Sequence, residues 1–305
     1  MLDKIISLNN ETSADISENF IREKMPEILE LLLIDRTKST KKTTKNIIWA
    51  NNNYTKHSAR YYAPTAQIKP ALITGKMECL IMPRALKSQE IQKERTRSKA
   101  EVFTPTWIVK KQNDAAEQDY LNDDLKTYIS RTWLEITCGE APYMATRYDM
   151  GTGKILPINE REGFIDRKLK RISSEVNDKS EWHTLAVLAY QTSYGFEWNG
   201  DSLLLARENL LYTYRDYYLE KWQEEPSFDK FKYIAEIISY NIFQMDGIKY
   251  IIPLSDTETV ASELQPDLFG DKTPSQAIAR TNGKRVKIMN WHTQKMEFFD
   301  KEIST

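Results

Sequence analysis

The sequence predicts an α/β protein with a parallel sheet, and three observations support this prediction. Strand-like runs occur at residues 133–136, 194–198 and 241–244. Helical patterns separate them, and this alternation is typical of a parallel sheet. Each run ends in a polar loop, and ligands of such sheets bind beyond the carboxyl ends of the strands. The 305 residues are enough for one large α/β domain with an appendage or for two modest domains.

The first hundred residues show a different pattern from the rest of the chain. A helix is expected within residues 16–35, where apolar residues recur at helical spacing and Pro26 is tolerated. The β-branched and aromatic run 46–50 predicts a buried strand, and residues 71–82 predict a hairpin. The charged segment 88–99 is expected to be helical or extended on the surface.

The elements of the predicted sheet lie in the part of the chain that begins at about residue 101. Asp201 is expected to cap a helix that follows the second strand, and another helix is expected over about residues 228–239. The polar segment 255–282 is expected to be a long surface loop, followed by a strand at 286–289. We therefore expect three regions: an N-terminal region (1–99), a core (100–254) and a loop with a C-terminal strand (255–305).

The basic residues are concentrated in one stretch. Residues 36–99 contain ten lysines and five arginines against three acidic residues, a net charge of +12; the whole chain carries −1, so the remainder carries −13. Clustered cations neutralise phosphates, which is typical of nucleic-acid binding. The alternative is a basic face that docks on the acidic remainder of the same chain. We expect DNA as a partner.

Other features of the composition exclude several classes of protein. No apolar run approaches the roughly 18 residues that a membrane span needs, and residues 1–6 lack the pattern of a signal peptide. We therefore expect a cytosolic protein. Only Cys79 and Cys138 are present, and the three histidines do not form a ligand-spaced set, so we expect no disulfide framework and no structural metal.

Three loops after the predicted strands carry residues that fit an adenosine. Cys138 and Gly139 follow the first strand, where glycine permits a tight turn and a close approach of the backbone to a ligand. Glu197, after the second strand, can accept both hydroxyls of a ribose, and Asp246, after the third, can accept an exocyclic amine. Together they predict a nucleoside pocket.

A string upstream of the first strand points to a family. Phe103, Thr104 and Pro105 resemble the Phe-Thr-Pro motif of many adenine methyltransferases that use S-adenosylmethionine (SAM). The resemblance implies that these three residues line the methionine end of the cofactor.

Residues 134–143 resemble the cofactor loop of the same family, whose usual form is Asp-Pro-x-Cys-Gly-x-Gly-x-Phe. Cys138 and Gly139 match it directly. Glu135 stands where the acid is expected, and Ala141 replaces the second glycine. The resemblance implies that Glu135, Cys138 and Gly139 bind SAM.

Longer strings extend the resemblance over most of the chain, from about residue 45 to the end. Residues 194–212 resemble the ribose-binding strand and helix, which implies a ribose contact for Glu197, and residues 241–247 resemble the next motif, which implies an adenine contact for Asp246. The segments that are similar to proteins called the M subunit of restriction endonucleases are 95–105, 133–149, 163–171 and 235–247. The implied fold is a Rossmann-like SAM-dependent methyltransferase sheet with flanking helices and a basic N-terminal region.

The catalytic motif of amino-group methyltransferases, Asn/Asp/Ser-Pro-Pro-Tyr/Phe, does not occur in the chain. Its oxygens accept the amine hydrogens while its aromatic ring stacks on the extruded base. Asn51 and Tyr54 follow the predicted strand 46–50 and are our candidates for these two roles, in a permuted order of strands. The alternative is Asn290 and Trp291 in the usual chain order.

We expect SAM-dependent methylation of an amino group in DNA, adenine N6 before cytosine N4, within a restriction-modification or phage-defence system. A restriction or specificity subunit is then a second expected partner. The alternative is a catalytically inactive subunit that binds SAM or DNA. Cytosine C5 methylation is disfavoured because neither cysteine has the placement of a nucleophile, and a nuclease site has little support beyond Asp166 and Lys168.

Overall fold

A three-stranded parallel sheet lies at the centre of the computed structural model, which describes residues 19–88, 104–261, 277–281 and 283–302 with positions 90, 92, 93, 96 and 97. The strands are β1 (Trp133–Glu135), β2 (Ser193–Glu197) and β3 (Ile242–Gln244), in the order β1-β2-β3. All three strands predicted for the core are confirmed, and both pairings are parallel. The protein is therefore of the α/β class.

Long helices connect the strands. α6 (Phe164–Glu175) and α7 (Lys179–Gln191) lie between β1 and β2, while α8 (Gly200–Trp222) and α9 (Phe228–Asn241) lie between β2 and β3. Both helices expected between β2 and β3 are confirmed. The expected cap is wrong: Asn199 is the N-cap of α8, and Asp201 lies inside its first turn.

The two faces of the sheet have different covers. Trp133 of β1 stacks on Phe164 of α6 with ring centroids 5.3 Å apart, and Ile242 of β3 joins the same helical core. On the other face, Phe196 and Phe243 pack with Phe299 in a smaller cluster. Successive side chains of a strand point to opposite faces, so each strand contributes to both layers.

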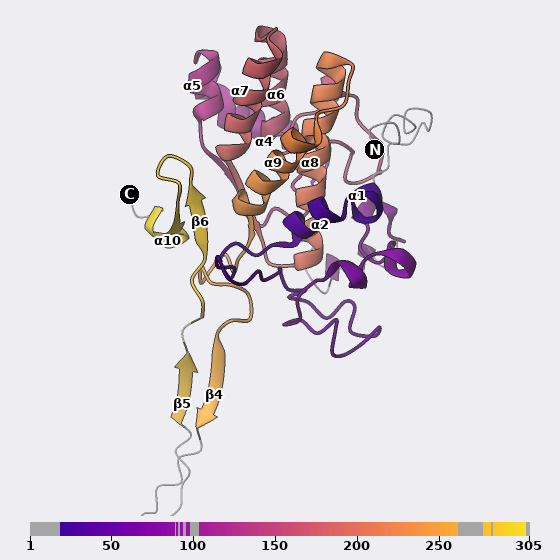
Figure 1. Cartoon of the computed structure of the whole chain (residues 1–305), viewed down its shortest axis with the longest axis vertical. Coiled ribbons are helices and arrows are strands. Elements are labelled where there is room, and N and C mark those ends of the chain that lie inside the picture. The colour runs from indigo at the N-terminus through magenta and orange to yellow at the C-terminus, as the bar shows by residue number, and fades with distance from the viewer. Residues whose placement is uncertain are drawn as a thin grey trace, which may run out of the picture.

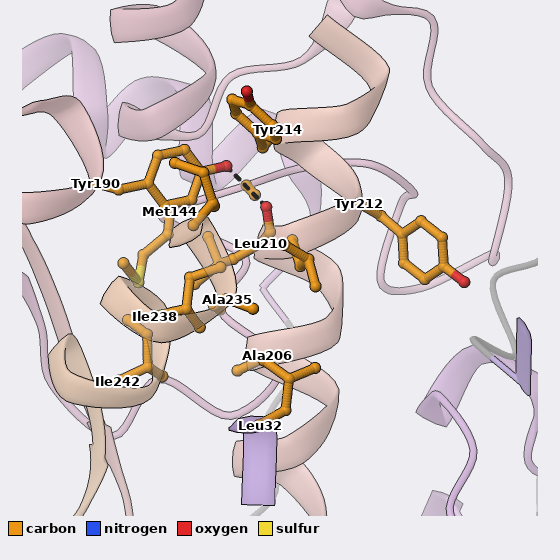
Figure 2. Close-up of a cluster of buried hydrophobic side chains, with 14 of the residues drawn as sticks. Leu32, Met144, Tyr190, Ala206, Leu210, Tyr212, Tyr214, Ala235, Ile238 and Ile242 are labelled. Atoms are coloured by element: carbon orange, nitrogen blue, oxygen red, sulfur yellow. Dashed lines mark hydrogen bonds between the residues drawn. The ribbon is translucent and has the colours of Figure 1, made fainter. Parts of the chain in front are cut away.

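The N-terminal region packs into the main core. α1 (Asn19–Lys24) and α2 (Pro26–Leu33) confirm the expected helix, divided at Pro26, and α2 packs against α8 and α9. Leu32 of α2 lies beside Ala206 of α8 (Figure 2). The Arg22 guanidinium forms a fully buried ion pair with Glu208 of α8 at 2.7 Å.

Two predictions for this region are wrong. Residues 46–50 form no strand and have only isolated bridges, at Asn46 and Ile48. The side-chain amide of Gln244 makes the two hydrogen bonds to Ile48 that a neighbouring strand would make. It accepts the Ile48 N–H at 3.0 Å and donates to the Ile48 carbonyl at 2.8 Å. Residues 71–82 form no hairpin. They contain the short 3-10 helices η3 (Pro70–Leu72) and η4 (Gly75–Met77).

The C-terminal part forms two hairpins apart from the central sheet. β4 (Thr257–Ala261) pairs with β5 (Ala277–Thr281), and this hairpin projects from the rest of the molecule (Figure 1), so the expectation of an unbroken surface loop is wrong. β6 (Lys287–Asn290), an expected strand, pairs with β7 (Lys295–Phe298) and leads to α10 (Phe299–Glu302).

The remaining elements are short or lie at the surface: η5 (Arg84–Leu86), α4 (Thr106–Glu117), η6 (Gln118–Tyr120), α5 (Leu125–Ser130) and η7 (Ile158–Glu160). Within the described ranges, no helix combines the length and apolar character that a bilayer crossing requires.

Candidate functional site

The loop after β1 adopts an uncommon backbone conformation. Thr137, Gly139 and Ala141 all have positive φ angles, of 47°, 56° and 62°. A positive φ angle costs about 1–2 kcal/mol for each residue that carries a Cβ. Such backbone strain clusters at functional sites. Ala141 therefore adopts a conformation that a glycine would adopt freely.

Glu197 joins the loops after β1 and β2. Its Oε2 accepts the Gly139 N–H at 3.0 Å, and its Oε1 accepts the backbone and side-chain N–H groups of Asn199 at 3.0 and 3.1 Å. Burial raises the pKa of this carboxyl. A Cβ added at Gly139 would meet no protein atom within 4 Å, so open space lies beside the glycine that contacts this carboxylate.

Glu135 and Cys138 are buried at the end of β1. The two carboxylate oxygens of Glu135 accept the backbone N–H groups of Tyr143 and Met144 at 3.2 and 3.0 Å, and burial raises its pKa to about 8. Burial also raises the pKa of the Cys138 thiol, so it is not an activated nucleophile. Each of the two buried carboxyls, Glu135 and Glu197, therefore holds its proton to a higher pH than an exposed glutamate does.

Asp246 follows β3 at the same edge of the sheet. The neighbouring Met245 N–H donates to the Glu197 carbonyl at 3.1 Å, which joins the third loop to the second. Asp246 Oδ1 accepts the N–H groups of Ile248 and Lys249 at 2.9 and 3.1 Å, so one oxygen stabilises its own turn.

Thr104 and Pro105 lie at the start of α4, where Pro105 is the N-cap. Asp149 Oδ2 accepts the N–H and the hydroxyl of Thr106, and the Asn113 amide donates to the Tyr143 carbonyl at 3.1 Å. α4 thus packs on the segment that continues from the loop after β1, while its start contacts Asp149 rather than Glu197. Phe103 lies outside the described residues.

Asn51 and Tyr54 lie at the carboxyl end of β2. The Asn51 amide donates to Asp201 Oδ1 at 2.9 Å and to Asn199 Oδ1 at 3.2 Å, while the Tyr54 hydroxyl donates to Asp201 Oδ2 at 2.6 Å. Asn199 in turn contacts Glu197. One hydrogen-bond network therefore connects both catalytic candidates with the expected ribose carboxylate.

The alternative pair, Asn290 and Trp291, lies at the opposite end of the sheet. Trp291 Nε1 donates to the Oδ1 of Asn241, the last residue of α9 before β3 begins, at 2.8 Å. Asn290 Oδ1 accepts the N–H groups of the two residues that follow Trp291, in the turn between β6 and β7. The structure does not bring this pair to the carboxyl ends of the strands.

Sequence reasoning missed two residues that position the site. Asn209 of α8 is fully buried, and its amide donates to the carbonyls of Glu140 and Ala145 at 3.1 and 3.3 Å, which holds the loop after β1 in place. Gln244 ends β3 and holds residue 48 in place. An asparagine within the apolar stripe of a helix is a usable signal for Asn209, because buried polar groups need partners.

Most of the described cations in the basic stretch are exposed. Its exposed cations are Lys41, Lys42, Lys45, Lys56, Arg60, Lys69, Lys76, Lys93 and Arg97. Arg36 pairs with Glu236, so part of the stretch does contact the acidic remainder. These side chains therefore face solvent rather than the acidic remainder of the chain.

The two residues considered for a nuclease site, Asp166 and Lys168, make hydrogen bonds within the protein. Asp166 accepts the N–H groups of Thr146 and Gly163, and Lys168 donates to the Arg131 carbonyl and to Thr192, all in or beside the core. Two cavities, of about 450 and 520 Å³, are lined by residues outside the loops after β1, β2 and β3. No group of three acidic, histidine or cysteine side chains suited to a metal occurs in the part of the chain that the structure describes.

No protein-family model, curated protein or solved structure matches this chain.

Proposed function

We propose that this chain binds SAM at the carboxyl ends of β1, β2 and β3 and acts in the methylation of DNA, with adenine N6 as the favoured target. The observation that carries the proposal is the hydrogen bond between Glu197 and Gly139 beside open space. A carboxylate at the end of the second strand and a glycine turn after the first are the parts of a nucleoside site in a doubly wound sheet. The sheet is, on this proposal, one half of a Rossmann-like methyltransferase sheet.

The residues present fit the cofactor. The Glu197 carboxylate would accept the ribose hydroxyls, and Asp246 Oδ2 would accept the adenine amine. Gly139 would let the cofactor approach the backbone, with Thr104 and Pro105 towards its methionine end. SAM carries a positively charged sulfonium group, and a cation bound beside Glu135 and Glu197 would favour the ionised form of these carboxyls, whose pKa values burial raises. When bound, SAM supplies the methyl group.

Calorimetry tests the cofactor claim. Purified chain is titrated with SAM and with its demethylated product, and we expect saturable binding of both at one site per chain. A titration with inosine-type analogues that lack the exocyclic amine reports on Asp246, since loss of that hydrogen bond weakens binding. Absence of heat with both SAM and its product at protein concentrations of about 100 μM would contradict the proposal, because Kd values weaker than about 1 mM fall outside cofactor binding.

The catalytic step is a separate claim. Asn51 and Tyr54 are the residues of this chain that we propose for the target amine and the extruded base, since they belong to the network that contains Glu197. The test is methyl transfer from labelled SAM to duplexes of varied sequence, followed by digestion to nucleosides to identify the methylated base. Binding of SAM without transfer to any DNA removes the enzyme claim and leaves the cofactor claim intact.

A second candidate function is a SAM- or DNA-binding subunit of a defence complex that is inactive by itself. The observation that favours it is the use of the Asn51 and Tyr54 polar atoms to anchor residues 46–54 on Asp201. The segment 46–54 is also fixed to β3, because the side chain of Gln244 accepts the Ile48 N–H. Asn51→Ala that folds and leaves the biological phenotype unchanged supports this candidate over the enzyme.

A further inference from the structure

Residues 51–63 form a loop whose two ends lie side by side. The Ala50 N–H donates to the Pro64 carbonyl at 2.8 Å, and the Trp49 N–H donates to the Ala66 carbonyl at 3.1 Å. Compact surface loops with adjacent ends, packed by their own side chains, are frequently functional. The two hydrogen bonds close this loop at its base.

The inner side of the loop is packed and anchored. Tyr54 and Tyr62 are each 5% exposed, and the centres of their rings lie 4.8 and 5.2 Å from that of Trp49. Trp49 Nε1 donates to the Tyr61 carbonyl at 3.2 Å, and the Tyr54 hydroxyl donates to Asp201 at 2.6 Å. The backbone at residue 61 is therefore fixed to the segment that contacts the proposed nucleoside site.

The outer side of the loop presents an aromatic ring beside cations. Tyr61 is 52% exposed, whereas the adjacent Tyr62 is buried. Lys56 and Arg60 are also exposed, and the Arg60 guanidinium lies 5.6 Å from the centre of the Tyr61 ring. The sequence of residues 51–63 contains no aspartate or glutamate. The loop thus has no acidic side chain of its own to neutralise these two charges.

A strand of nucleic acid with an unpaired base fits this arrangement. Every base has a π-face that can stack on an aromatic ring, and cations beside the ring neutralise the phosphates that flank the base. The bases of an intact duplex stack on one another, so they would leave the Tyr61 ring unused. The exposed ring therefore favours an unpaired nucleotide over the backbone of a paired duplex.

We propose that the loop 51–63 holds an unpaired nucleotide of DNA: Tyr61 stacks on the base, while Lys56 and Arg60 contact the flanking phosphates. The inference rests on the proposed function, since an enzyme that modifies a base in DNA takes that base out of the stack. Asn51 belongs to the same loop and connects it through Asn199 to Glu197. The nucleotide is thus held by the loop that also contributes to the proposed site.

Chemical modification of tyrosine in the full chain is the first test, and it involves neither SAM nor DNA. N-acetylimidazole acetylates accessible tyrosine hydroxyls, and peptide mass spectrometry reports the rate at each position. We expect Tyr61 to react roughly tenfold faster than Tyr54 and Tyr62, because buried side chains react only after local opening. Equal rates at the three positions would show that another segment of the chain covers the Tyr61 ring, and this would overturn the proposal.

The second test is binding of a single-stranded oligonucleotide, measured by fluorescence anisotropy. Tyr61→Ala should weaken binding by roughly 5- to 100-fold, and Tyr61→Phe, which keeps the ring, should bind within about twofold of wild type. Tyr233→Ala removes a tyrosine of α9 that is 42% exposed, and this control should bind as wild type does.

The two cations are tested by the salt dependence of the same binding. Lys56→Ala combined with Arg60→Ala should reduce the slope of log K against log salt by roughly 1.4, which is about 0.7 for each phosphate contact with a single strand. Lys126→Ala combined with Lys295→Ala, at two exposed positions outside the basic stretch, is the control. An equal reduction in the control would indicate a net-charge effect and would contradict the role of Lys56 and Arg60.

Four further results overturn the proposal. They are no binding of the single strand by wild type, equal binding by Tyr61→Ala and wild type, an equal loss in Tyr233→Ala, and an equal loss in Tyr61→Ala on a fully paired duplex. Binding of polyglutamate with the same dependence on Tyr61 would point to an acidic protein partner instead, and this also contradicts it.

Calorimetry with SAM separates this inference from the proposed function. Binding of SAM, together with DNA binding that does not depend on Tyr61, contradicts the inference alone. Binding of DNA that depends on Tyr61, without any binding of SAM, contradicts the proposed function and leaves the role of the loop intact.

Discussion

The Glu197 carboxylate accepts the Gly139 N–H at 3.0 Å, and this hydrogen bond joins the loops that follow β1 and β2. Glu197→Gln keeps the size of the side chain but removes the charge and one acceptor oxygen. We expect SAM affinity to fall by roughly 10- to 100-fold, since a hydrogen bond to a charged group contributes about 1.5–3 kcal/mol. Calorimetry measures this, with Glu220→Gln at an exposed position as the control. Equal affinities in the two variants would remove Glu197 from the site.

Gly139 and Gly75 form a matched pair. Both have positive φ, of 56° and 62°, and a Cβ at either would meet no atom within 4 Å. Each change to alanine should lower the free energy of unfolding by about 1–2 kcal/mol for conformational reasons. Only Gly139→Ala should also weaken SAM binding, because its methyl group enters the proposed cofactor space. Thermal unfolding and calorimetry test the two effects, and a loss of SAM binding in both variants would argue for a general disturbance.

Burial of Glu135 makes stability depend on pH. Its pKa is raised from 4.5 to about 8 in the folded protein, mainly by desolvation. The unfolded state therefore loses this proton first as the pH rises, so the contribution of Glu135 to stability is full below about pH 4.5 and is lost towards pH 8. We expect wild type to lose stability relative to Glu135→Gln between pH 5 and pH 8 in urea unfolding. A pH-independent difference between the two would contradict the assignment.

The basic surface should bind DNA through phosphates. Replacing Lys41, Lys42 and Lys45 with alanine should lower affinity for duplexes of any sequence. It should also reduce the slope of log K against log salt by roughly 0.9 for each phosphate that the variant no longer neutralises. Fluorescence anisotropy across salt concentrations measures both effects. The control removes the same charge at Lys111, Lys126 and Lys295, which are also exposed, and an equal reduction there would indicate only a net-charge effect.

Tyr54 has two separable properties, a hydroxyl and a ring. Tyr54→Phe removes the donor to buried Asp201, and we expect a loss of about 1–3 kcal/mol of stability. If the ring stacks on an extruded base, Phe should keep methyl transfer within about twofold while Ala abolishes it. Tyr62→Phe, which removes a bond to the Leu72 carbonyl in the same aromatic cluster, is the control. Loss of transfer in Tyr54→Phe would count against stacking as the role.

The sequence predicted the elements whose hydrophobic pattern decides their structure. The three core strands and α2, α8 and α9 follow from apolar spacing, because packing and local preference agree there. Residues 46–50 share the composition of a strand, but they form only isolated bridges with Ile34 and Gln67 and a side-chain contact from Gln244, partners that no local pattern reveals. In residues 71–82 the buried Ile73 and Ile81 are held in short turns rather than alternating along strands.

Part of the candidate site could be predicted, because some of its residues follow from the order of the strands. Gly139, Glu197 and Asp246 follow parallel strands, and the carboxyl ends of such strands meet at one edge. The role of Asn209 could not be read in the same way, because its acceptors are distant in the chain, 69 and 64 residues away. The link from Asn51 through Asn199 to Glu197 also depends on tertiary packing alone.

The ion pair between Arg22 and Glu208 limits how the chain can be shortened. Both side chains are fully enclosed, one near the start of the described residues and the other in the middle of α8. A shortened chain that begins after Lys24 would leave the buried Glu208 carboxylate without the Arg22 guanidinium. We expect this to lower the free energy of unfolding by about 3–5 kcal/mol. The helices α1 and α2 are therefore integral to the folded core, and recombinant forms for binding or crystallisation experiments need to retain them.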